Sequence, residues 1–177
     1  MRELIALFML AASFAAASAQ TQMNATFASA GGLPAACGPE KQSPGGMSDG
    51  TRKAAVEPEQ GKARIYVLRD DGVLETGPKV RIGLDGKWIG ENRGNSWFSV
   101  LVGPGEHHVC AIPDSKMKLG NLVELAHFRA EAGKDYYLRS RFTITPYQEY
   151  LVIDFIDSDQ GKYLAAKLPQ AVSQPGR

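Results

Sequence analysis

Histidine is the residue type in this chain that bears most directly on metal or acid–base chemistry. There are three: His107 and His108 are adjacent, and His127 lies further along. A catalytic zinc site usually has three protein ligands and one open position. Adjacent side chains in a strand point to opposite faces of the sheet, so His107 and His108 cannot readily share a metal ion. We therefore expect His107 to brace the Pro104-Gly105 turn through a ring hydrogen bond, with the other two histidines exposed. A metal-dependent hydrolase is the least favoured function.

Acidic and nucleophilic side chains do not form a recognisable catalytic set either. Asp157-x-Asp159-x-Gly161 matches half of a calcium loop, but the remaining acidic or amide ligand and the later glutamate are not there. These acids more simply cap a helix. Gly94-Asn95-Ser96-Trp97 is not the G-x-S-x-G of a nucleophile elbow. We expect no catalytic residue, no metal and no cofactor, and hence a protein that is not an enzyme.

A binding surface is the chemistry that the residue types favour instead. On a strand over residues 135–143, inward-facing Tyr136, Leu138 and Phe142 would leave alternate side chains in an outward row. The candidate binding face comprises Tyr137, Arg139 and Arg141 from that row, with Trp88 and Trp97 as a sugar-stacking platform. Tyrosine and arginine are favoured at binding hot spots.

Ordinary cross-strand pairing is the alternative to this binding face. Arg139 could pair with Asp154, and Arg141 with Glu149, on a solvated sheet surface. The tryptophans could equally be core residues or hairpin partners. Both possibilities stay open at this point.

The two cysteines, Cys37 and Cys110, favour one disulfide if the chain reaches an oxidising compartment. The bridge would close a loop of about 73 residues and contribute roughly 4 kcal/mol in the loop-entropy account. The alternative is two independent buried thiols.

The N-terminus predicts export. Met1-Arg2 supplies a positive charge, Leu4–Ala17 is almost continuously apolar, and Ala17-Ser18-Ala19 presents small residues at the positions that signal peptidase recognises. We expect cleavage after Ala19, although Glu3 is unusual there. A membrane anchor is disfavoured because a spanning helix needs about 20 apolar residues. We expect a periplasmic or secreted protein with no transmembrane anchor in the mature chain. The formal net charge of +1 gives no reason to expect a nucleic-acid partner.

The elements that must position these residues are mostly strands. From Lys62 onward, short runs rich in β-branched and aromatic residues alternate with Gly, Pro, Asp and Asn. We expect about eight short antiparallel strands, the pattern of a sandwich or barrel. The expected strands cover residues 63–69, 79–84, 87–90, 96–102, 106–112, 122–130, 135–143 and 149–156. Asp85-Gly86 predicts a type I′ hairpin, and 122–130 with 135–143 should form another. Asp157 should cap a helix over residues 158–167, weakened by Gly161.

Two stretches resemble known exported bacterial domains. Val80–Gly90 with Phe98–Val102 and Gly103–His107 is similar to the PEGA pattern of strand, Asp-Gly hairpin, strand and Pro-Gly-x-His turn. Ala130–Arg139 resembles the "GK-x-YY" segment of the uncharacterised family called domain of unknown function 2846. The resemblance covers roughly residues 58–156. It implies a β-sandwich module of unassigned role and carries no catalytic residue. Members of that family are often lipoproteins, but position 20 is Gln, so anchoring does not carry over.

The expected organisation has four parts. Residues 1–19 are the signal peptide, and 20–60 are a flexible leader rich in Ala, Gly, Pro and Ser, in which order near Cys37 stays open. Residues 61–168 are an all-β sandwich (PEGA- or immunoglobulin-like) with a short C-terminal helix, and 169–177 are a disordered tail. The favoured function is a non-enzymatic module that contacts a protein or another cell-envelope component. The alternative is a sandwich that binds a small ligand or carbohydrate.

Overall fold

A computed structural model of the chain describes residues 32–39, 47–49, 60–71, 78–114, 123–147 and 149–173. The predicted signal peptide and the remaining parts of the leader and tail lie outside these residues. In the described part, no helix is long and apolar enough to cross a membrane.

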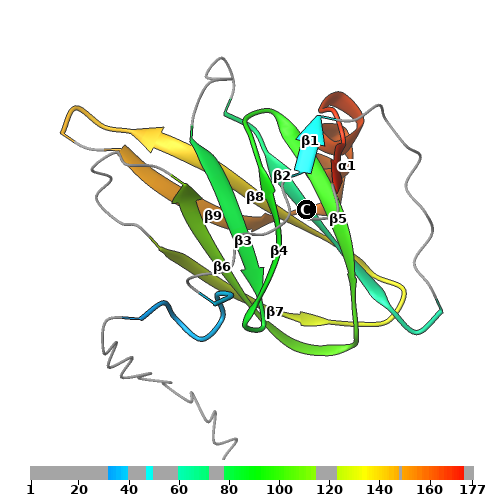
Figure 1. Cartoon of the computed structure of the whole chain (residues 1–177). Helices are drawn as coiled ribbons and strands as arrows, with labels where there is room; N and C mark the ends of the chain where they lie inside the picture. Colours follow the sequence, from blue (N-terminus) through cyan, green and yellow to red (C-terminus); the bar gives the residue numbers. More distant parts are fainter. Residues whose placement is uncertain are drawn as a thin grey trace, which may run out of the picture.

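Eight strands of the described chain form two four-stranded sheets packed as a sandwich, as predicted (Figure 1). The first sheet has the order β5-β2-β8-β9, with bounds Ser96–Val102, Ala63–Arg69, Asp135–Ile144 and Glu149–Ile156. The second has the order β4-β3-β6-β7, with bounds Lys87–Asn92, Lys79–Leu84, Gly105–Asp114 and Glu124–Ala130. The helix α1 spans Ser158–Lys167, as the capping pattern predicted.

The main core lies between the two sheets and follows the period-two pattern of the strands. Its fully buried side chains include Ile65, Ile82, Phe98, Leu138 and Leu151. Burial of such side chains contributes roughly 1.5–3 kcal/mol each, before the conformational entropy that opposes it.

The Asp85-Gly86 hairpin between β3 and β4 has the predicted type I′ geometry. Asp85 has a φ of 50° and Gly86 a φ of 82°. Both central residues of this turn need positive φ, which Asp tolerates better than most residues and Gly adopts readily.

The connection from β7 to β8 corrects two predictions. Residues 122–130 and 135–143 were expected to form a hairpin, but β7 pairs with β6 while β8 pairs with β2 and β9. The turn between them hydrogen-bonds to the start of β2 instead: Gly133 N donates to Lys62 O, and Arg64 N donates to Lys134 O. The chain therefore crosses from one sheet to the other and enters β8 parallel to β2, although all strand pairs were expected to be antiparallel.

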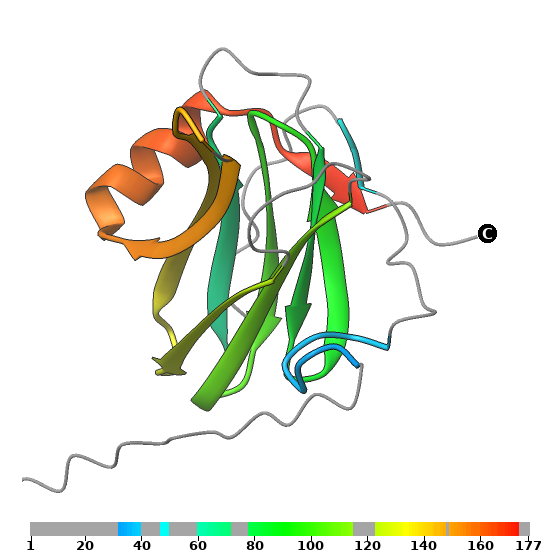
Figure 2. The same ribbon diagram turned by 90° about the vertical axis from the view of Figure 1, so that its left-hand side faces the viewer.

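Each sheet carries a cover on its outer face (Figure 2). The helix packs on the first sheet, which we call the helix-side sheet. There Leu164 and Leu168 lie against Tyr66, Leu68 and Trp97. Residues 32–39, which we call the strap, lie on the second sheet, called the strap-side sheet. Because β2 is covered on both faces, all of its residues are buried.

The tail and leader are more ordered than predicted. Residues 169–173 were expected in a disordered tail, yet Trp97 N donates to Pro169 O, and β10 (Ala171–Ser173) pairs with β1 (Met47–Asp49). The leader was expected to be flexible, with order near Cys37 left open. The strap, which contains Cys37, and β1 both have defined positions within it. Nonlocal pairing supplies the hydrogen bonds that these short segments could not make alone.

Candidate functional site

Tyr137, the central residue of the predicted binding face, is covered. Its exposed fraction is 4%, because it lies beneath α1 and stacks on Tyr66 with ring centroids 4.8 Å apart. Burial raises the pKa of its hydroxyl to about 12. A Cβ added to Gly161 would lie 2.1 Å from Cγ of Tyr137, so this glycine permits the close approach of helix and ring. The alternation of β8 was predicted correctly, but the part of its outer face around Tyr137 is under the helix.

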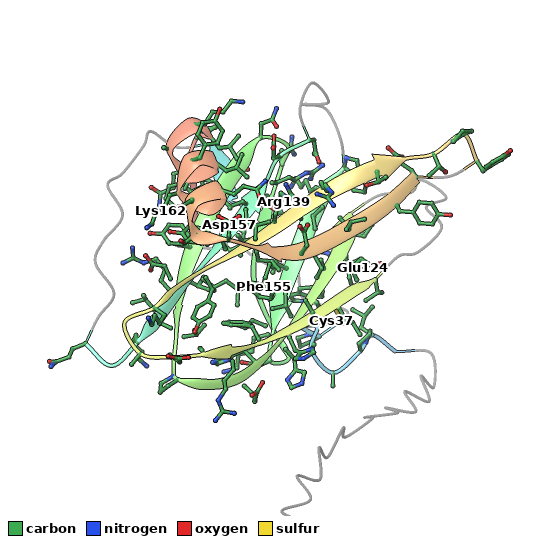
Figure 3. All side chains as sticks on the ribbon, turned by 180° about the vertical axis from the view of Figure 1, so that it is seen from behind. Cys37, Glu124, Arg139, Phe155, Asp157 and Lys162 are labelled. Atoms are coloured by element: carbon green, nitrogen blue, oxygen red, sulfur yellow. A yellow bond between two sulfur atoms is a disulfide. The ribbon has the colours of Figure 1, made fainter. Side chains whose placement is uncertain are left out.

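The two arginines of the predicted face share one carboxylate. Arg139 Nη2 lies 2.8 Å from Asp154 Oδ2, and Arg141 Nη1 lies 3.8 Å from Asp154 Oδ1 (Arg139 is labelled in Figure 3). The first pair is the cross-strand alternative raised by the sequence. The second differs from it, because Arg141 lies opposite Val152 in the register and not opposite Glu149. Arg141 is the more exposed of the two arginines.

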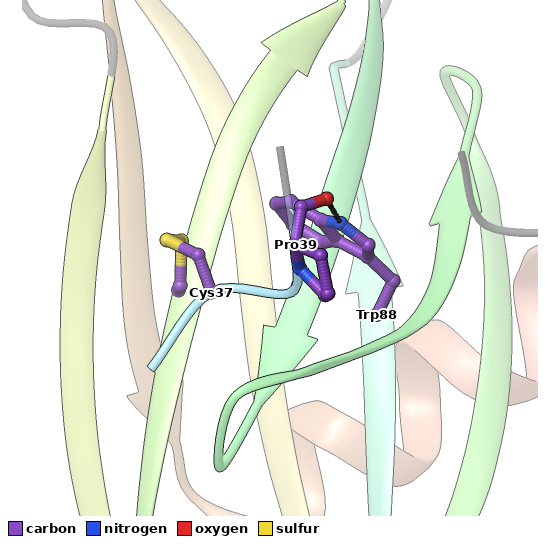
Figure 4. Close-up of a disulfide and its surroundings, with 4 residues drawn as sticks. Cys37, Pro39 and Trp88 are labelled. Atoms are coloured by element: carbon purple, nitrogen blue, oxygen red, sulfur yellow. Dashed lines mark hydrogen bonds between the residues drawn. A yellow bond between two sulfur atoms is a disulfide. The ribbon is translucent and has the colours of Figure 1, made fainter. Parts of the chain in front are cut away.

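The two tryptophans do not form a platform. Trp97 is buried under the C-terminal end of the helix, and its Nε1 donates to Leu168 O at 3.1 Å. Trp88 lies on the strap-side sheet, and its Nε1 donates to Pro39 O at 3.0 Å (Figure 4). The Arg81 guanidinium lies 4.8 Å from the centroid of the Trp88 ring. They belong to different sheets, so the predicted sugar-stacking platform of Trp88 and Trp97 is wrong.

The predicted disulfide is present. Cys37 in the strap and Cys110 in β6 are bonded, with Cα atoms 5.1 Å apart. Both are buried in a small apolar cluster that includes Ile112, Trp88 and Val123. The bond attaches the strap to the outer face of the sheet (Figure 4).

His107 braces its turn, as predicted, and also holds the β3–β4 hairpin. Its Nε2 lies 2.8 Å from Gly103 O, and its Nδ1 lies 2.6 Å from Asp85 Oδ2. A carbonyl and a carboxylate can only accept, so both bonds together require the doubly protonated ring. Burial opposes this charge, but the hydrogen bonds from the ring to Asp85 and Gly103 outweigh it and raise the pKa of His107.

Asp85 is the matching acid of this pair. Partial burial favours its neutral form, but the backbone N–H of His108 and the ring of His107 both donate to it. These donors outweigh burial and hold the pKa of Asp85 below its ordinary value. The result is a charge-assisted link between the tip of the hairpin and the start of β6.

His108 and His127 lie on the other face of the sheet from His107. They are directly opposite in the β6–β7 register, with ring centroids 6.4 Å apart and both side chains exposed. Within the described ranges, no three His, Cys, Asp or Glu side chains gather closely enough to hold a metal ion. The strand geometry places His107 and His108 on opposite faces, as the period-two rule predicted.

Asp157 acts as the helix cap. Its Oδ1 accepts from Asp159 N at 2.9 Å and from Gln160 N at 3.0 Å. The backbone hydrogen bond from Gln160 is the main cause that lowers the pKa of Asp157. The predicted capping role of Asp157 is confirmed, and Asp159 lies in the first turn of the helix.

Tyr147 is an exposed residue that sequence reasoning missed. β2 pairs with β8 only as far as Ser140, so residues 141–144 of β8 and 149–152 of β9 continue as a two-stranded ribbon. Figure 3 shows this hairpin extending beyond the rest of the sandwich. Tyr147, in its turn, is 97% exposed. The sequence signal for this residue was an aromatic side chain directly after Pro146, in the turn between two predicted strands.

Arg69 is a second residue whose role sequence reasoning missed. Its side chain is fully buried, and its Nε lies 2.5 Å from Oδ2 of Asp71, whose side chain is 2% exposed. Arg69 Nη1 also donates to Pro78 O and to Asn92 O, and its guanidinium lies 5.0 Å from the ring centroid of Phe142. The side chain thus joins the two sheets at one end of the sandwich.

Comparison with known proteins adds one relative. No protein-family model matches the chain, and no solved structure matches it. A Haemophilus influenzae protein described as uncharacterized is 26% identical over 123 residues, which cover 70% of this chain and 69% of that protein. The resemblance to domain of unknown function 2846 therefore stays a prediction.

Proposed function

We propose that the chain is an exported bacterial envelope protein that acts by binding another envelope protein and not by catalysis. The observation that carries the proposal is the disulfide between Cys37 and Cys110, which joins the leader to the sandwich. Disulfides form and persist in oxidising compartments such as the periplasm. The signal-like N-terminus supports the same compartment.

The contact surface is the end of the β8–β9 ribbon. Tyr147 is almost fully exposed there, and Pro146 beside it is exposed as well. Arg141 adds a partly exposed guanidinium on the same ribbon. Tyrosine supplies a large contact area at a low entropic cost, and both tyrosine and arginine are enriched at hot spots of protein interfaces. The ribbon extends away from the covers on both sheets, so a partner protein reaches it without displacing either (Figure 1).

Export is tested by expressing the full chain with a C-terminal tag in a bacterial host. We expect the tagged protein in the periplasmic fraction, with a mass that corresponds to cleavage after Ala19 and with both cysteines oxidised. Uncleaved protein in the cytoplasm with two titratable thiols would contradict the proposal.

Contact is tested by placing a photo-crosslinking amino acid at position 147 or, as the control, at position 163. Tyr163 is also an exposed tyrosine, at 64%, but it lies on the helix and not on the ribbon. We expect a discrete protein adduct from position 147 and none from position 163. The adduct should disappear with Arg141→Ala. Equal adducts at the two positions, or an adduct with glycan only, would refute the proposed surface.

A further inference from the structure

We propose that the strap is an oxidation-latched cover: the sandwich folds without it, and disulfide formation then locks the strap over an apolar seat on the strap-side sheet. The seat consists of Trp88, Cys110, Ile112 and Val123. In the dithiol form the strap is released and the seat is exposed. This inference does not depend on the contact role proposed above. It relies on export only for the location of the oxidant.

The strap is separate from the main core. The buried residues of that core lie between Ala63 and Ala171, and its partly buried neighbours also lie in the sandwich. Strap residues belong to a different cluster on the outer face, together with Cys110 and Ile112. Loss of the strap therefore removes no side chain from the space between the two sheets.

The seat is shaped for the strap. A Cβ on Gly38 would lie 2.3 Å from Cδ1 of Trp88, and a Cβ on Gly83 would lie 2.9 Å from both Ala36 O and the Cα of Cys37. Glycine at both positions lets the strap backbone lie directly on the ring and on the sheet. Gly86 N donates to Ala36 O at 3.1 Å, which adds the tip of the β3–β4 hairpin to the seat.

Few hydrogen bonds join the strap to the seat. Among the described residues, Gly86 N donates to Ala36 O and Trp88 Nε1 donates to Pro39 O. Ordering a strap backbone has an entropic cost at every residue. The disulfide lowers that cost, because it already restricts the chain before the strap docks. We therefore expect the strap to depend on the bond.

The latch closes by thiol–disulfide exchange. The thiolate of one cysteine attacks an oxidant that contains a disulfide, forms a mixed disulfide and releases one thiol. The second cysteine then displaces the remaining oxidant thiol, so Cys37 and Cys110 lose two electrons and two protons in total while the oxidant disulfide is reduced to two thiols. Both sulfur atoms are buried in the closed state, which shields the bond from attack by external thiolates.

The test compares the purified full chain before and after reduction, with 5-fluorotryptophan at the two tryptophan positions. Fluorine NMR reports Trp88 in the seat and Trp97 under the helix separately, and Trp88→Phe assigns the signals. We expect reduction to shift only the Trp88 signal to a solvent-exposed position. Amide exchange should rise by about tenfold or more in residues 33–39 and stay unchanged in β2. Oxidised glutathione should restore the original spectrum.

Two outcomes would overturn the inference. If both tryptophan signals collapse, the sandwich requires the strap and does not fold before it. If neither signal moves, the strap stays docked without the bond and there is no latch. Cys37→Ser should reproduce the reduced spectrum in the absence of any reductant.

A matched glycine pair tests the fit while the disulfide is intact. Gly38→Ala places its methyl group against Trp88, whereas Gly32→Ala meets no atom within 4 Å. We expect Gly38→Ala to shift the Trp88 signal and to make dithiothreitol reduce the bond several-fold faster, and Gly32→Ala to leave both unchanged. Equal behaviour of the two variants would show that the strap does not sit tightly on the seat.

Discussion

Replacement of Arg69 by methionine should be among the most destabilising single changes in the sandwich. Methionine keeps an unbranched apolar chain of similar reach but removes the guanidinium. Asp71 then loses its ionic partner in a site where its side chain is only 2% exposed. The carbonyl oxygens of Pro78 and Asn92 also lose a charged donor.

The expected loss of folding free energy can be estimated from the carboxylate and the carbonyl groups that lose Arg69 as their partner. Removing one partner of a buried ion pair typically costs about 3–5 kcal/mol, because the other charge stays buried without compensation. Each backbone carbonyl oxygen that is left without a donor adds a further cost of about 1–3 kcal/mol where water cannot reach it. Asp71 keeps one donor, since Phe142 N lies 3.3 Å from its Oδ1. These terms overlap, so we expect a total of about 4 kcal/mol. That is a large part of a typical folding free energy of about 5–15 kcal/mol.

Urea denaturation at pH 7, monitored by far-UV circular dichroism, measures this loss of stability. The loss is read from the shift of the denaturation midpoint, provided that the unfolding free energy falls with urea concentration at the same slope in both proteins. Asp71→Asn and the double variant complete the thermodynamic cycle. We expect the double variant to be less destabilised than the sum of the two single changes, with a coupling energy above about 1 kcal/mol. A loss below about 1 kcal/mol for Arg69→Met, or strictly additive single changes, would refute the role assigned to this pair.

Two further predictions concern the helix and the hairpin. Alanine normally stabilises a helix by about 1 kcal/mol relative to glycine, but Gly161→Ala should cost about 1–3 kcal/mol because its methyl group overlaps Tyr137. The exposed Lys162→Ala should change stability by less than about 0.5 kcal/mol, and a stabilised Gly161→Ala would contradict the packing. The pKa of His107 is raised in the folded protein. The contribution of His107 to folding stability is therefore complete below its ordinary pKa of 6.5 and is lost as the pH rises through the folded pKa. The pKa of Asp85 is lowered in the folded protein. The contribution of Asp85 to folding stability is therefore complete above its ordinary pKa of 3.8 and is lost as the pH falls through the folded pKa. The urea midpoint should therefore be highest between these limits, and His107→Gln should flatten the alkaline side. If His107→Gln leaves the pH dependence of the urea midpoint unchanged, the pair of His107 and Asp85 is not the cause of that dependence.

Local sequence chemistry predicted the elements accurately where one short-range rule decides them. The bounds of β2, β3, β5 and β9 match the expected strands, and the hairpin at Asp85 has the expected turn. The helix begins after Asp157 because its carboxylate caps the first turn. Turn geometry, capping and alternation all act over a few residues, so they can be recognised without knowledge of the fold.

The candidate binding face failed for a nonlocal reason. Alternation places Tyr137 on the outer face of β8, but it cannot show that a helix some twenty residues later returns to cover that face. Arg69 illustrates the opposite case. The sequence shows that Arg69 alternates with Ile65 and Val67, so the three side chains lie on the same face of the strand. It does not show the partners that stabilise the buried guanidinium, because these come from segments far apart in the chain.

The histidines and cysteines show most clearly where the two kinds of information divide. The sequence by itself separated His107 from His108, because successive side chains in a strand must point to opposite faces, and it paired Cys37 with Cys110 because no other cysteine is present. Only the tertiary structure brought Asp85 against His107, placed the strap over Trp88 and left Tyr147 at the end of a projecting ribbon. These arrangements depend on which strands become neighbours and on which faces receive a cover. Both are set by packing of the whole domain and not by any short stretch of residues.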